Sequence, residues 1–344
     1  MQFAFTEDQL AITQAAREML VETCQPADLR RMLAAQAARD AARWQTIVDM
    51  GLLGLLAPDE AAGMGLAPVD LVGIAEAAGY VGLPEPLVET AGIGVPLLAA
   101  LGDASRLAAA IAGESVAIGY PGRRFVADAD TAGTLLLADG DALHLVDAKD
   151  VGLTRQESID PFRRLFRVDW TPTEATRQTI GWGDTADRGA VMTAAQLIGI
   201  GQRAIDLAVA YAKERNQFGK PIGSYQAIKH LIATAQVAVE FARPVVYAAA
   251  AELPLDSVAS RARISHAKIV AGEAADLATR TAVQVHGAMG ITWEIDVHFF
   301  LKRALALRAD WGTTAFHTAR VLERIMTLPT GPDLTFSSDV ARAA

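Results

Sequence analysis

The sequence predicts an α+β protein that is mostly α-helical, and three observations lead to that class. Both ends of the chain repeat apolar residues at helical spacing. A middle stretch of roughly 114–172 instead alternates short apolar runs with turn signals. At 344 residues the chain is long enough for two or three packed units. We therefore expect an N-terminal helical domain over 1–113, a shortened β-rich middle domain over 114–185, a C-terminal helical bundle over 186–330 and a tail over 331–344.

The N-terminal helices are predicted by caps and by breaks in the helical period. Thr6 precedes "EDQLAITQAAREML", whose apolar residues recur at helical spacing, so Thr6 is expected to cap a first helix. The stretch "MGLLGLLAPDEAAGMGLAPVD" is rich in Gly and Pro and predicts a loop between helices. In the middle domain, "ESVAIGYPG", "GTLLLADGDALHLVDAKDVGLTRQ" and "RRLFRVDW" predict short strands, with a turn at Asp139-Gly140.

Four long amphipathic or apolar stretches predict an up-and-down four-helix bundle in the C-terminal part. They are "AVMTAAQLIGIGQRAIDLAVAYAKERNQF", "YQAIKHLIATAQVAVEFARPVVYAAAAE", "SRARISHAKIVAGEAADLATRTAVQVHG" and "DVHFFLKRALALR". Apolar residues make up 51% of the chain, and many of them are alanine. Apolar helical surface beyond what one subunit buries favours an oligomer.

Charge and composition exclude several classes of protein. A net charge of −9, without a dense block of Lys and Arg, is unfavourable for nucleic-acid binding. The N-terminus lacks a basic segment before an apolar core, and no uncharged apolar run is long enough to cross a bilayer. Cys24 is the single cysteine, and no Cys/His cluster resembles a metal site. We expect a cytoplasmic protein without a membrane span, a disulfide or a bound metal.

The most specific stretch is "AKERNQFGKPIGSYQAIKHLIA" (212–233), in which Arg215 ends a helix and a Phe-Gly turn follows. An arginine beside a glycine turn and a new helix N-terminus is suited to a phosphate group. The alternative is an ordinary helix–helix connection in which Arg215 caps carbonyl groups. A second stretch, "TAVQVHGAMGITWEI" (281–295), places Gln284 near a helix end before glycines. These glycines suit either close approach of a ligand or a simple helix C-cap.

Together these stretches resemble the acyl-CoA dehydrogenase family. "FTEDQLAITQAAREML", "GLLGLLAPDEAAGMGL" (51–66) and the helix–strand–helix order also resemble it. The resemblance covers nearly the whole chain and is weakest between about 114 and 185. It implies dehydrogenation of an acyl-CoA between Cα and Cβ, with FAD as the hydride acceptor and an electron-transfer flavoprotein or similar partner reoxidising the FAD.

The family's "RxxFG" and "QxxGG" motifs hold the FAD of a neighbouring subunit, and the resemblance assigns this in-trans role to residues of this chain. By that resemblance, Arg215 binds the pyrophosphate, and the residues beside it in the cofactor site are Gln217, Phe218, Gln226, Gln284 and Gly287, with Ala288 replacing the second glycine of "QxxGG". His286 is expected to be a hydrogen-bonded polar group beside this turn rather than a catalytic residue.

The middle domain departs from the family. Neither a "TEPxAGSD"-like loop nor a "KxWITN"-like strand, which contact the flavin ring in the family, is found in "ESVAIGYPGRRFVADAD" and the segment after it. Pro121-Gly122 resembles a remnant of the first loop. This chain has therefore lost the recognised contacts to a flavin ring of its own.

The catalytic glutamate of the family is also missing. Alignment from Gln284 places Trp311 at its usual position, and counting back from Arg215 places Gly189 at the alternative one, followed by Ala190. The fallback base is Asp310, which is one residue, or about 100° on a helix, out of register. We expect Asp310 to cap the turn or to pair with an arginine such as Arg308 or Arg188, and Glu294 to be structural.

A retained in-trans half-site beside a missing base is typical of one subunit of a heteromer. Known family heteromers of actinobacterial steroid catabolism pair a subunit lacking the glutamate with one that has it, as α2β2 assemblies. The resemblance thus implies that this chain completes the FAD site of a partner with the glutamate and takes part in dehydrogenation of an acyl-CoA, with steroid side-chain esters implied by analogy. The alternatives are a self-sufficient homo-oligomer that uses Asp310 as base, and a non-catalytic acyl-CoA-binding or scaffold protein.

Overall fold

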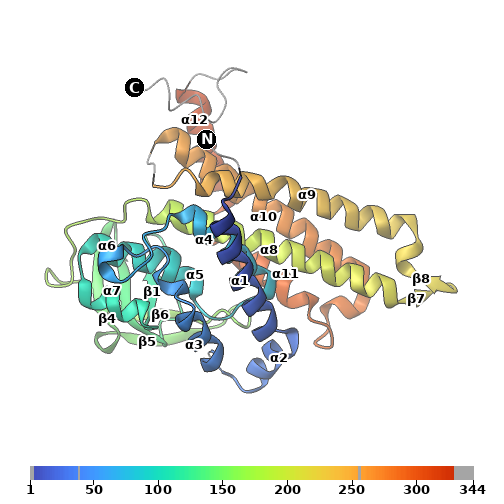
Figure 1. Cartoon of the computed structure of the whole chain (residues 1–344), viewed down its shortest axis with the longest axis horizontal. Helices are drawn as coiled ribbons and strands as arrows, with labels where there is room; N and C mark the ends of the chain where they lie inside the picture. Colours follow the sequence, from blue (N-terminus) through green and yellow to red (C-terminus); the bar gives the residue numbers. More distant parts are fainter. Residues whose placement is uncertain (1–3, 38, 255–256, 329–344) are drawn as a thin grey trace.

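The computed structural model describes residues 4–37, 39–254 and 257–328. In Figure 1 the N-terminal helices and the strands lie at one end of an elongated molecule, and long helices run from them to a distant tip. Helices come first, strands second and helices last, so the predicted mostly α-helical class with its helix–strand–helix order is confirmed. The tail predicted over 331–344 lies outside the described residues.

The N-terminal helices surround a core of leucine, isoleucine and alanine side chains. The α-helices are α1 (Glu7–Thr23), α2 (Pro26–Ala34), α3 (Ala41–Asp49), α4 (Pro68–Val81), α5 (Leu87–Glu89), α6 (Val95–Leu101) and α7 (Ala104–Ile111). The Thr6 cap is confirmed: its hydroxyl accepts from the Gln9 N–H at 3.2 Å, and the Gln9 side chain accepts from the Thr6 N–H at 2.9 Å. Inside this layer, Arg43 donates two hydrogen bonds, at 2.7 and 2.8 Å, to the buried carboxylate of Glu85.

The strands form two small three-stranded sheets. Their bounds are β1 (Ser115–Gly119), β2 (Val126–Ala127), β3 (Ala132–Asp139), β4 (Ala142–Asp147), β5 (Gly152–Gln156) and β6 (Leu165–Asp169). One sheet has the order β1-β3-β4, with β1 parallel to β3, and the other has the order β2-β6-β5 and is antiparallel. The sequence analysis did not anticipate the two-residue strand β2.

The C-terminal bundle is built on α8 (Thr185–Glu214), the longest helix of the described residues. Four further helices follow: α9 (Gln226–Ala250), α10 (Val258–His286), α11 (Val297–Arg308) and α12 (Thr314–Thr327). Helices α9, α10 and α11 all pack against α8, and α12 packs against α10. At the tip, β7 (Asn216–Gln217) and β8 (Lys220–Pro221) form a small hairpin between α8 and α9 (Figure 1).

Two glycines join the N-terminal layer to the bundle. A Cβ atom on Gly79 of α4 would lie 2.0 Å from the carbonyl oxygen of Gln196, and one on Gly199 of α8 would lie 1.9 Å from that of Glu76. The backbones of α4 and α8 are therefore in direct contact at this crossing. This contact holds α8 in place against the N-terminal helices.

Among the described residues, one helix is long and apolar enough by composition to cross a bilayer, namely α9. One face of α9 packs on α8 and α10, while Leu231, Val237 and Phe241 on the other are 44–76% exposed. A helix that packs in the bundle of a folded protein meets the same criterion, so this is weak evidence for a span.

We predict that Gly79→Ala destabilises the fold by about 2 kcal/mol or more, because the added methyl group meets backbone that side-chain rotation cannot move. Chemical denaturation measures this loss. Gly181→Ala is the matched control, since a Cβ atom there meets nothing within 4 Å. Equal stability of the two variants would contradict the direct contact of α4 with α8.

Candidate functional site

The first candidate site is the hairpin at the tip of the bundle, where α8 ends. Arg215 is the C-cap residue that follows α8, and its backbone is extended, with φ −71° and ψ 116°. Phe218 and Gly219, at φ 54° and 85°, make the two-residue turn that joins β7 to β8. Positive φ at both central positions is the geometry of a type I′ hairpin, which costs energy at a non-glycine residue such as Phe218.

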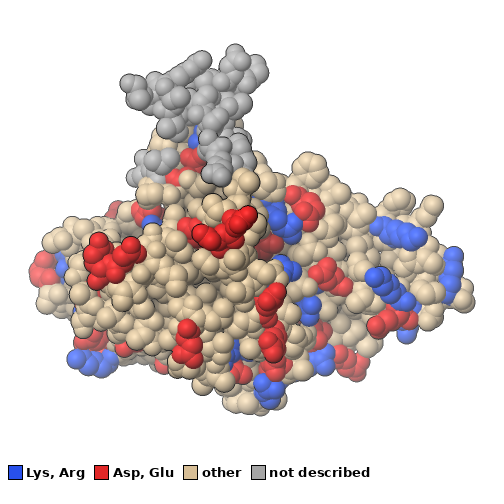
Figure 2. All heavy atoms as spheres, viewed as in Figure 1, with Lys and Arg blue, Asp and Glu red and all other residues tan. Residues whose placement is uncertain are grey.

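The side chains of this turn point away from the rest of the subunit. Phe218 is 93% exposed, and Arg215, Gln217 and Gln226 are also exposed. Within the described part of the chain, no carboxylate pairs with the Arg215 guanidinium and no carbonyl accepts from it, so it is not the helix cap considered above. Tyr225 supports the turn, since its hydroxyl donates to the Gln217 carbonyl at 3.1 Å. Figure 2 shows basic side chains grouped over this end of the molecule.

The second motif lies at the end of α10, on the same tip. Gln284 is exposed in the last turn, and Gly287, at φ 63°, is the C-cap whose N–H donates to the Gln284 carbonyl. The glycine therefore does act as a helix cap, and the residue that follows it, Ala288, is exposed. Ala288 takes the place of a glycine without disturbing the cap.

An aromatic stack brings the two motifs together. The ring of His286 lies on that of Tyr211, one turn before Arg215, with centroids 4.3 Å apart. The Nδ1 atom of His286 is 2.7 Å from the Ala282 carbonyl oxygen, and burial lowers the pKa of the imidazole. His286 is thus the hydrogen-bonded polar group that we expected. The two motifs share one surface: a free guanidinium, an exposed aromatic ring, amide side chains and a capped helix end.

The second candidate site is the interior at the junction of sheets and bundle, where Trp311 occupies the expected position of the base. Its indole stacks on the ring of Tyr120, with centroids 3.9 Å apart and planes 20° apart. The backbone N–H of Trp311 donates to the Tyr120 hydroxyl at 2.7 Å. Trp311 is 5% exposed and has φ 54°, a conformation that costs a non-glycine residue about 1–2 kcal/mol. The stack and this hydrogen bond stabilise that conformation.

The carboxylate of Asp310 lies at the centre of a buried ionic cluster. It pairs with Arg123 and Arg163 and accepts a hydrogen bond from the Tyr120 hydroxyl at 2.9 Å. The expectation that Asp310 pairs with an arginine is confirmed, but Arg188 and Arg308 were the wrong partners.

Those two arginines bind other carboxylates. Arg188 pairs one turn back with Asp184 at 2.8 Å, and Arg308 lies 3.5 Å from Asp276. The true partners of Asp310 come from loops of the β-rich part, far away in sequence. Glu294 is exposed, and its carbonyl accepts a hydrogen bond from Arg30 at 2.9 Å, which is a structural contact.

Two buried basic groups hold the turn that carries Asp310 and Trp311. The Lys268 ammonium donates to the carbonyls of Leu307 and Arg308, at 3.0 Å each, and so caps the end of α11. Burial lowers the pKa of Lys268 to about 8. His317 contacts the Trp311 carbonyl through Nε2 at 3.1 Å, and burial lowers its pKa to about 3, so this ring is neutral.

Gly189, at the alternative position of the base, explains how Trp311 fits. A Cβ atom at Gly189 would lie 2.2 Å from Cδ2 of the Trp311 indole. Any larger residue there would displace the indole, and a glutamate would overlap it completely. The two positions at which a catalytic carboxylate was expected are thus in direct contact, with a tryptophan at one and the glycine that accommodates it at the other.

Little space is left around this stack. Two cavities of about 30 and 20 Å³ lie beside Arg163, and both are lined by Glu89 and Asp128. Ligand sites typically measure about 300–1,000 Å³, so a flavin ring does not fit here. Desolvation raises the pKa of Asp128 to about 7, with a further contribution from Glu89, whose pKa is itself raised by burial.

Sequence analysis missed Tyr120, Arg123, Arg163, Lys268 and His317 as members of this cluster. A faint signal was present in the two Arg-Arg pairs of the middle domain, 123–124 and 163–164. Nothing local to these pairs shows which carboxylate they meet. The Pro121-Gly122 turn, interpreted above as a remnant loop, is the segment that brings Tyr120 and Arg123 to Asp310, with the Arg123 N–H donating to the Tyr120 carbonyl at 3.0 Å.

The two sites differ in the chemistry they allow. The tip offers a guanidinium without an ion pair in the described part of the chain, exposed amides and an exposed ring, which suit a ligand that has both phosphate and aromatic groups. The interior has a carboxylate, but its two arginine partners and its lack of adjoining space oppose proton abstraction from a substrate.

Comparison with known proteins gives the same assignment along the chain. Residues 6–111 match the acyl-CoA dehydrogenase N-terminal domain, and residues 183–326 match the acyl-CoA dehydrogenase C-terminal domain. Among the described residues, no group of three or more His, Cys, Asp or Glu side chains is placed to hold a metal ion.

Relatives match along most of the chain. Acyl-CoA dehydrogenase IpdE2 of Mycobacterium tuberculosis is 33% identical over 309 residues, covering 87% of this chain and 91% of IpdE2. A chain of the ChsE4-ChsE5 complex from Mycobacterium tuberculosis superposes with a TM-score of 0.85 at 22% identity, covering 96% of this chain and all of that one. The Tcur3481-Tcur3483 steroid ACAD superposes at 0.81 and 20% identity, covering 93% and 98%. This protein therefore belongs to the acyl-CoA dehydrogenase family.

Proposed function

We propose that this chain is the subunit without a catalytic base in a heteromeric, FAD-dependent acyl-CoA dehydrogenase. In this proposal it completes the FAD site of a homologous partner that carries the glutamate, in an α2β2 assembly in the cytoplasm. The observation that carries the proposal is a contrast between two sites. The cofactor motifs at the tip are exposed and complete except for Ala288, while the interior that would hold a flavin ring is filled by the chain's own side chains.

The tip fits the phosphate end of FAD. Arg215 provides a guanidinium without an ion pair among the described residues, and a guanidinium binds phosphate oxygens in a bidentate manner. Phe218 offers an almost fully exposed ring, and Gln217, Gln226 and Gln284 offer amide groups around it. Side chains that are this exposed in their own subunit are well placed to contact a cofactor that a neighbour holds.

The interior supports the other half of the proposal. FAD, when bound, accepts the hydride from the acyl group, and that chemistry requires space for the flavin ring and a free base. In this chain Trp311 and Tyr120 occupy the space, and Asp310 is paired with two arginines. The partner therefore provides the base, and this chain contributes cofactor binding.

Exposed apolar side chains on the bundle support an extensive interface. On α9 they are Leu231, Val237 and Phe241, and on α12 they are Phe316, Leu322, Ile325 and Met326, all at least 44% exposed. Apolar patches of this kind typically mark protein–protein contacts. Their position on the bundle, whose tip carries the FAD motifs, fits a partner that packs along these helices.

The acyl group is assigned by analogy. The Tcur3481-Tcur3483 protein is a steroid ACAD, and ChsE4-ChsE5 is a complex of two proteins. We infer that the substrate here is a CoA ester with a bulky acyl group, such as a steroid side chain, and that an electron-transfer flavoprotein or a similar acceptor takes up the electrons. Fold-level likeness is the basis of this assignment.

Two alternative functions make different demands on the same residues. A self-sufficient homo-oligomer requires Asp310 as base, which its two ion pairs and the filled interior oppose. A scaffold or acyl-CoA-binding protein without flavin has no need for the unpaired Arg215 or for a strained turn that exposes Phe218.

Arg215 tests the phosphate contact of the proposed function. In the complex co-expressed with its partner, Arg215→Ala is expected to lower bound flavin at least about tenfold, because a charge-assisted pair to the pyrophosphate is lost. Flavin absorbance per complex measures this. Arg177→Ala, at an exposed arginine of the β-rich part, is the control and should retain its flavin. Unaltered flavin in Arg215→Ala would remove the phosphate assignment.

The isolated chain and Asp310 test whether this subunit has a catalytic base of its own. The chain purified alone is expected to hold no flavin and to oxidise no acyl-CoA, whereas the complex does both. Asp310→Asn is expected to lower the free energy of unfolding by about 3–5 kcal/mol, because two buried arginines lose their counter-ion. Turnover per bound flavin in the complex should not change. An isolated chain that is active and loses activity in Asp310→Asn would establish the homo-oligomeric alternative instead.

A further inference from the structure

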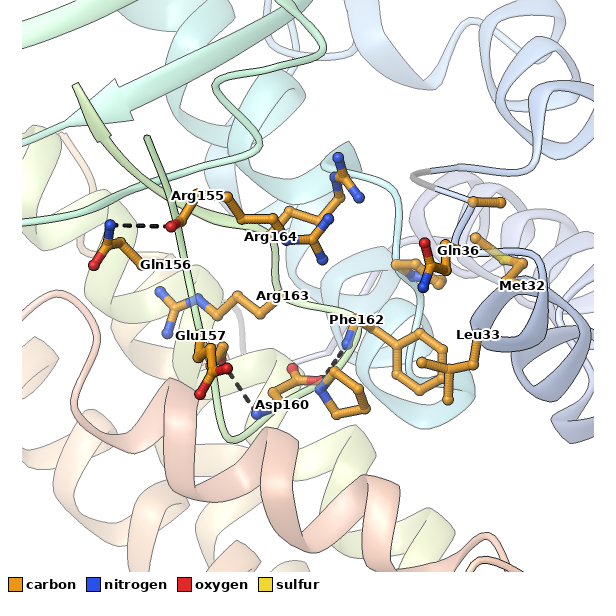
Figure 3. Close-up of a pocket in the computed structure, with 14 residues that line it drawn as sticks. Met32, Leu33, Gln36, Arg155, Gln156, Glu157, Asp160, Phe162, Arg163 and Arg164 are labelled. Atoms are coloured by element: carbon orange, nitrogen blue, oxygen red, sulfur yellow. Dashed lines mark hydrogen bonds between the residues drawn. The ribbon is translucent and has the colours of Figure 1, made fainter. Parts of the chain in front are cut away.

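A large cleft opens on the side of the molecule away from the tip. It has a volume of about 690 Å³, far more than the two interior cavities and within the range of small-molecule sites. Figure 3 shows its two walls. One is the C-terminal end of α2, with Met32, Leu33 and Gln36. The other is the end of β5, with Arg155, together with the loop from β5 to β6, with Arg163 and Arg164. Neither wall contains a residue of the FAD motifs.

The floor of the cleft is apolar and firmly held. Phe162 is 8% exposed and packs edge-on against Phe299, with ring centroids 5.2 Å apart. The Phe162 N–H donates to Asp160 at 3.0 Å, and Asp160 in turn pairs with Arg303 of α11. Together with Leu33 and Pro84, this ring offers a preformed surface for an apolar molecule.

Two unpaired charges lie on the loop wall. The guanidinium of Arg163 is bound to Asp310, and that of Arg164 is bound to Asp130. In the part of the chain that the structure describes, Arg155 and Glu157 form no ion pair, although both are exposed and both line the cleft. Arg155 is therefore free to bind an anion, and Glu157 opposes it by repulsion.

The opposite wall carries a residue in a strained conformation. Gln36 follows the end of α2 at φ 51°, and the Gln36 and Ala37 N–H groups donate to the carbonyls of Leu33 and Met32. This is the helix-ending motif in which glycine is usual, because other residues pay about 1 kcal/mol or more for a positive φ. Here the position instead places an amide side chain at the cleft, and strain of this kind is common at ligand sites.

From these observations we propose that the cleft between α2 and the β5–β6 loop binds a small amphipathic organic anion, with its apolar body on Leu33 and Phe162 and its carboxylate or phosphate on Arg155. Gln36 donates a hydrogen bond from the facing wall. None of the residues assigned to the FAD site lines this cleft, and the proposal does not depend on the proposed function.

The test uses anilinonaphthalene sulfonate, a fluorescent aromatic anion, titrated into the full-length protein. Dodecanoate and dodecyl phosphate then compete with the bound dye, which distinguishes a carboxylate from a phosphate as the preferred head group. Arg155→Gln is expected to weaken the competed binding about tenfold, because the charge-assisted contact is lost. Glu157→Gln is expected to strengthen it about twofold, because a repelling charge is removed.

Two further variants make the test specific. Gln36→Gly is expected to weaken binding about threefold while leaving the melting temperature equal or higher, because glycine removes both the amide and the strain. A purely structural role for Gln36 predicts no change in binding. Arg167→Gln is the control, since Arg167 lies on the neighbouring strand β6, pairs with Asp169 and does not line the cleft.

The signs of these shifts decide the outcome. Opposite shifts in Arg155→Gln and Glu157→Gln, with no shift in Arg167→Gln, support the proposal. Binding that is unchanged in Arg155→Gln, or equally weakened in Arg167→Gln, overturns it and assigns the dye to other apolar surfaces. Flavin content of the co-expressed complex should be the same in all four variants, so a failure here is distinct from a failure of the proposed function.

Discussion

The ionic cluster around Asp310 determines most of what is unusual in this protein. A buried carboxylate needs close counter-charges, and here they come from Arg123 and Arg163 in the β-rich part. The cluster therefore joins the sheets to the end of α11. The same contacts bring the Tyr120 ring against Trp311, and the Tyr120 hydroxyl binds both the carboxylate and the Trp311 N–H. One set of interactions thus joins two parts of the fold and fills the interior.

The interior beside this cluster is filled by a large side chain that packs against a glycine. Trp311 brings in a large indole, and Gly189 removes every side-chain atom that would meet it. Protein interiors are close-packed, so the pair has to change together. Lys268 and His317 hold the intervening turn from the far side. The result is a well-packed core at this position, which agrees with the proposal that a partner carries the base.

The tip hairpin and the cleft beside α2 differ from this interior, because their polar groups are exposed. At the tip, Phe218 has a strained backbone, and Arg215 forms no ion pair among the described residues; in the proposed assembly both contact the cofactor of a neighbour. At the opposite side, Gln36 is strained and Arg155 is unpaired beside an apolar floor. In both places a residue with a strained backbone lies at the surface beside an exposed arginine. In the interior, by contrast, the charged groups around Asp310 are paired with one another.

The sequence by itself determined the elements and the tip. Helical spacing and caps such as Thr6 are local, and so are the Arg215 and Gln284 motifs, since each lies at the end of a single helix. The prediction that Trp311 and Gly189 stand where a base is expected also came from local register. Only the tertiary structure decided the partners of Asp310, because Arg123 lies 187 residues away and nothing near it specifies a carboxylate. The Tyr120 stack and the cleft beside α2 likewise depend on segments that meet only when α8 packs on α4 and the sheets close against α11.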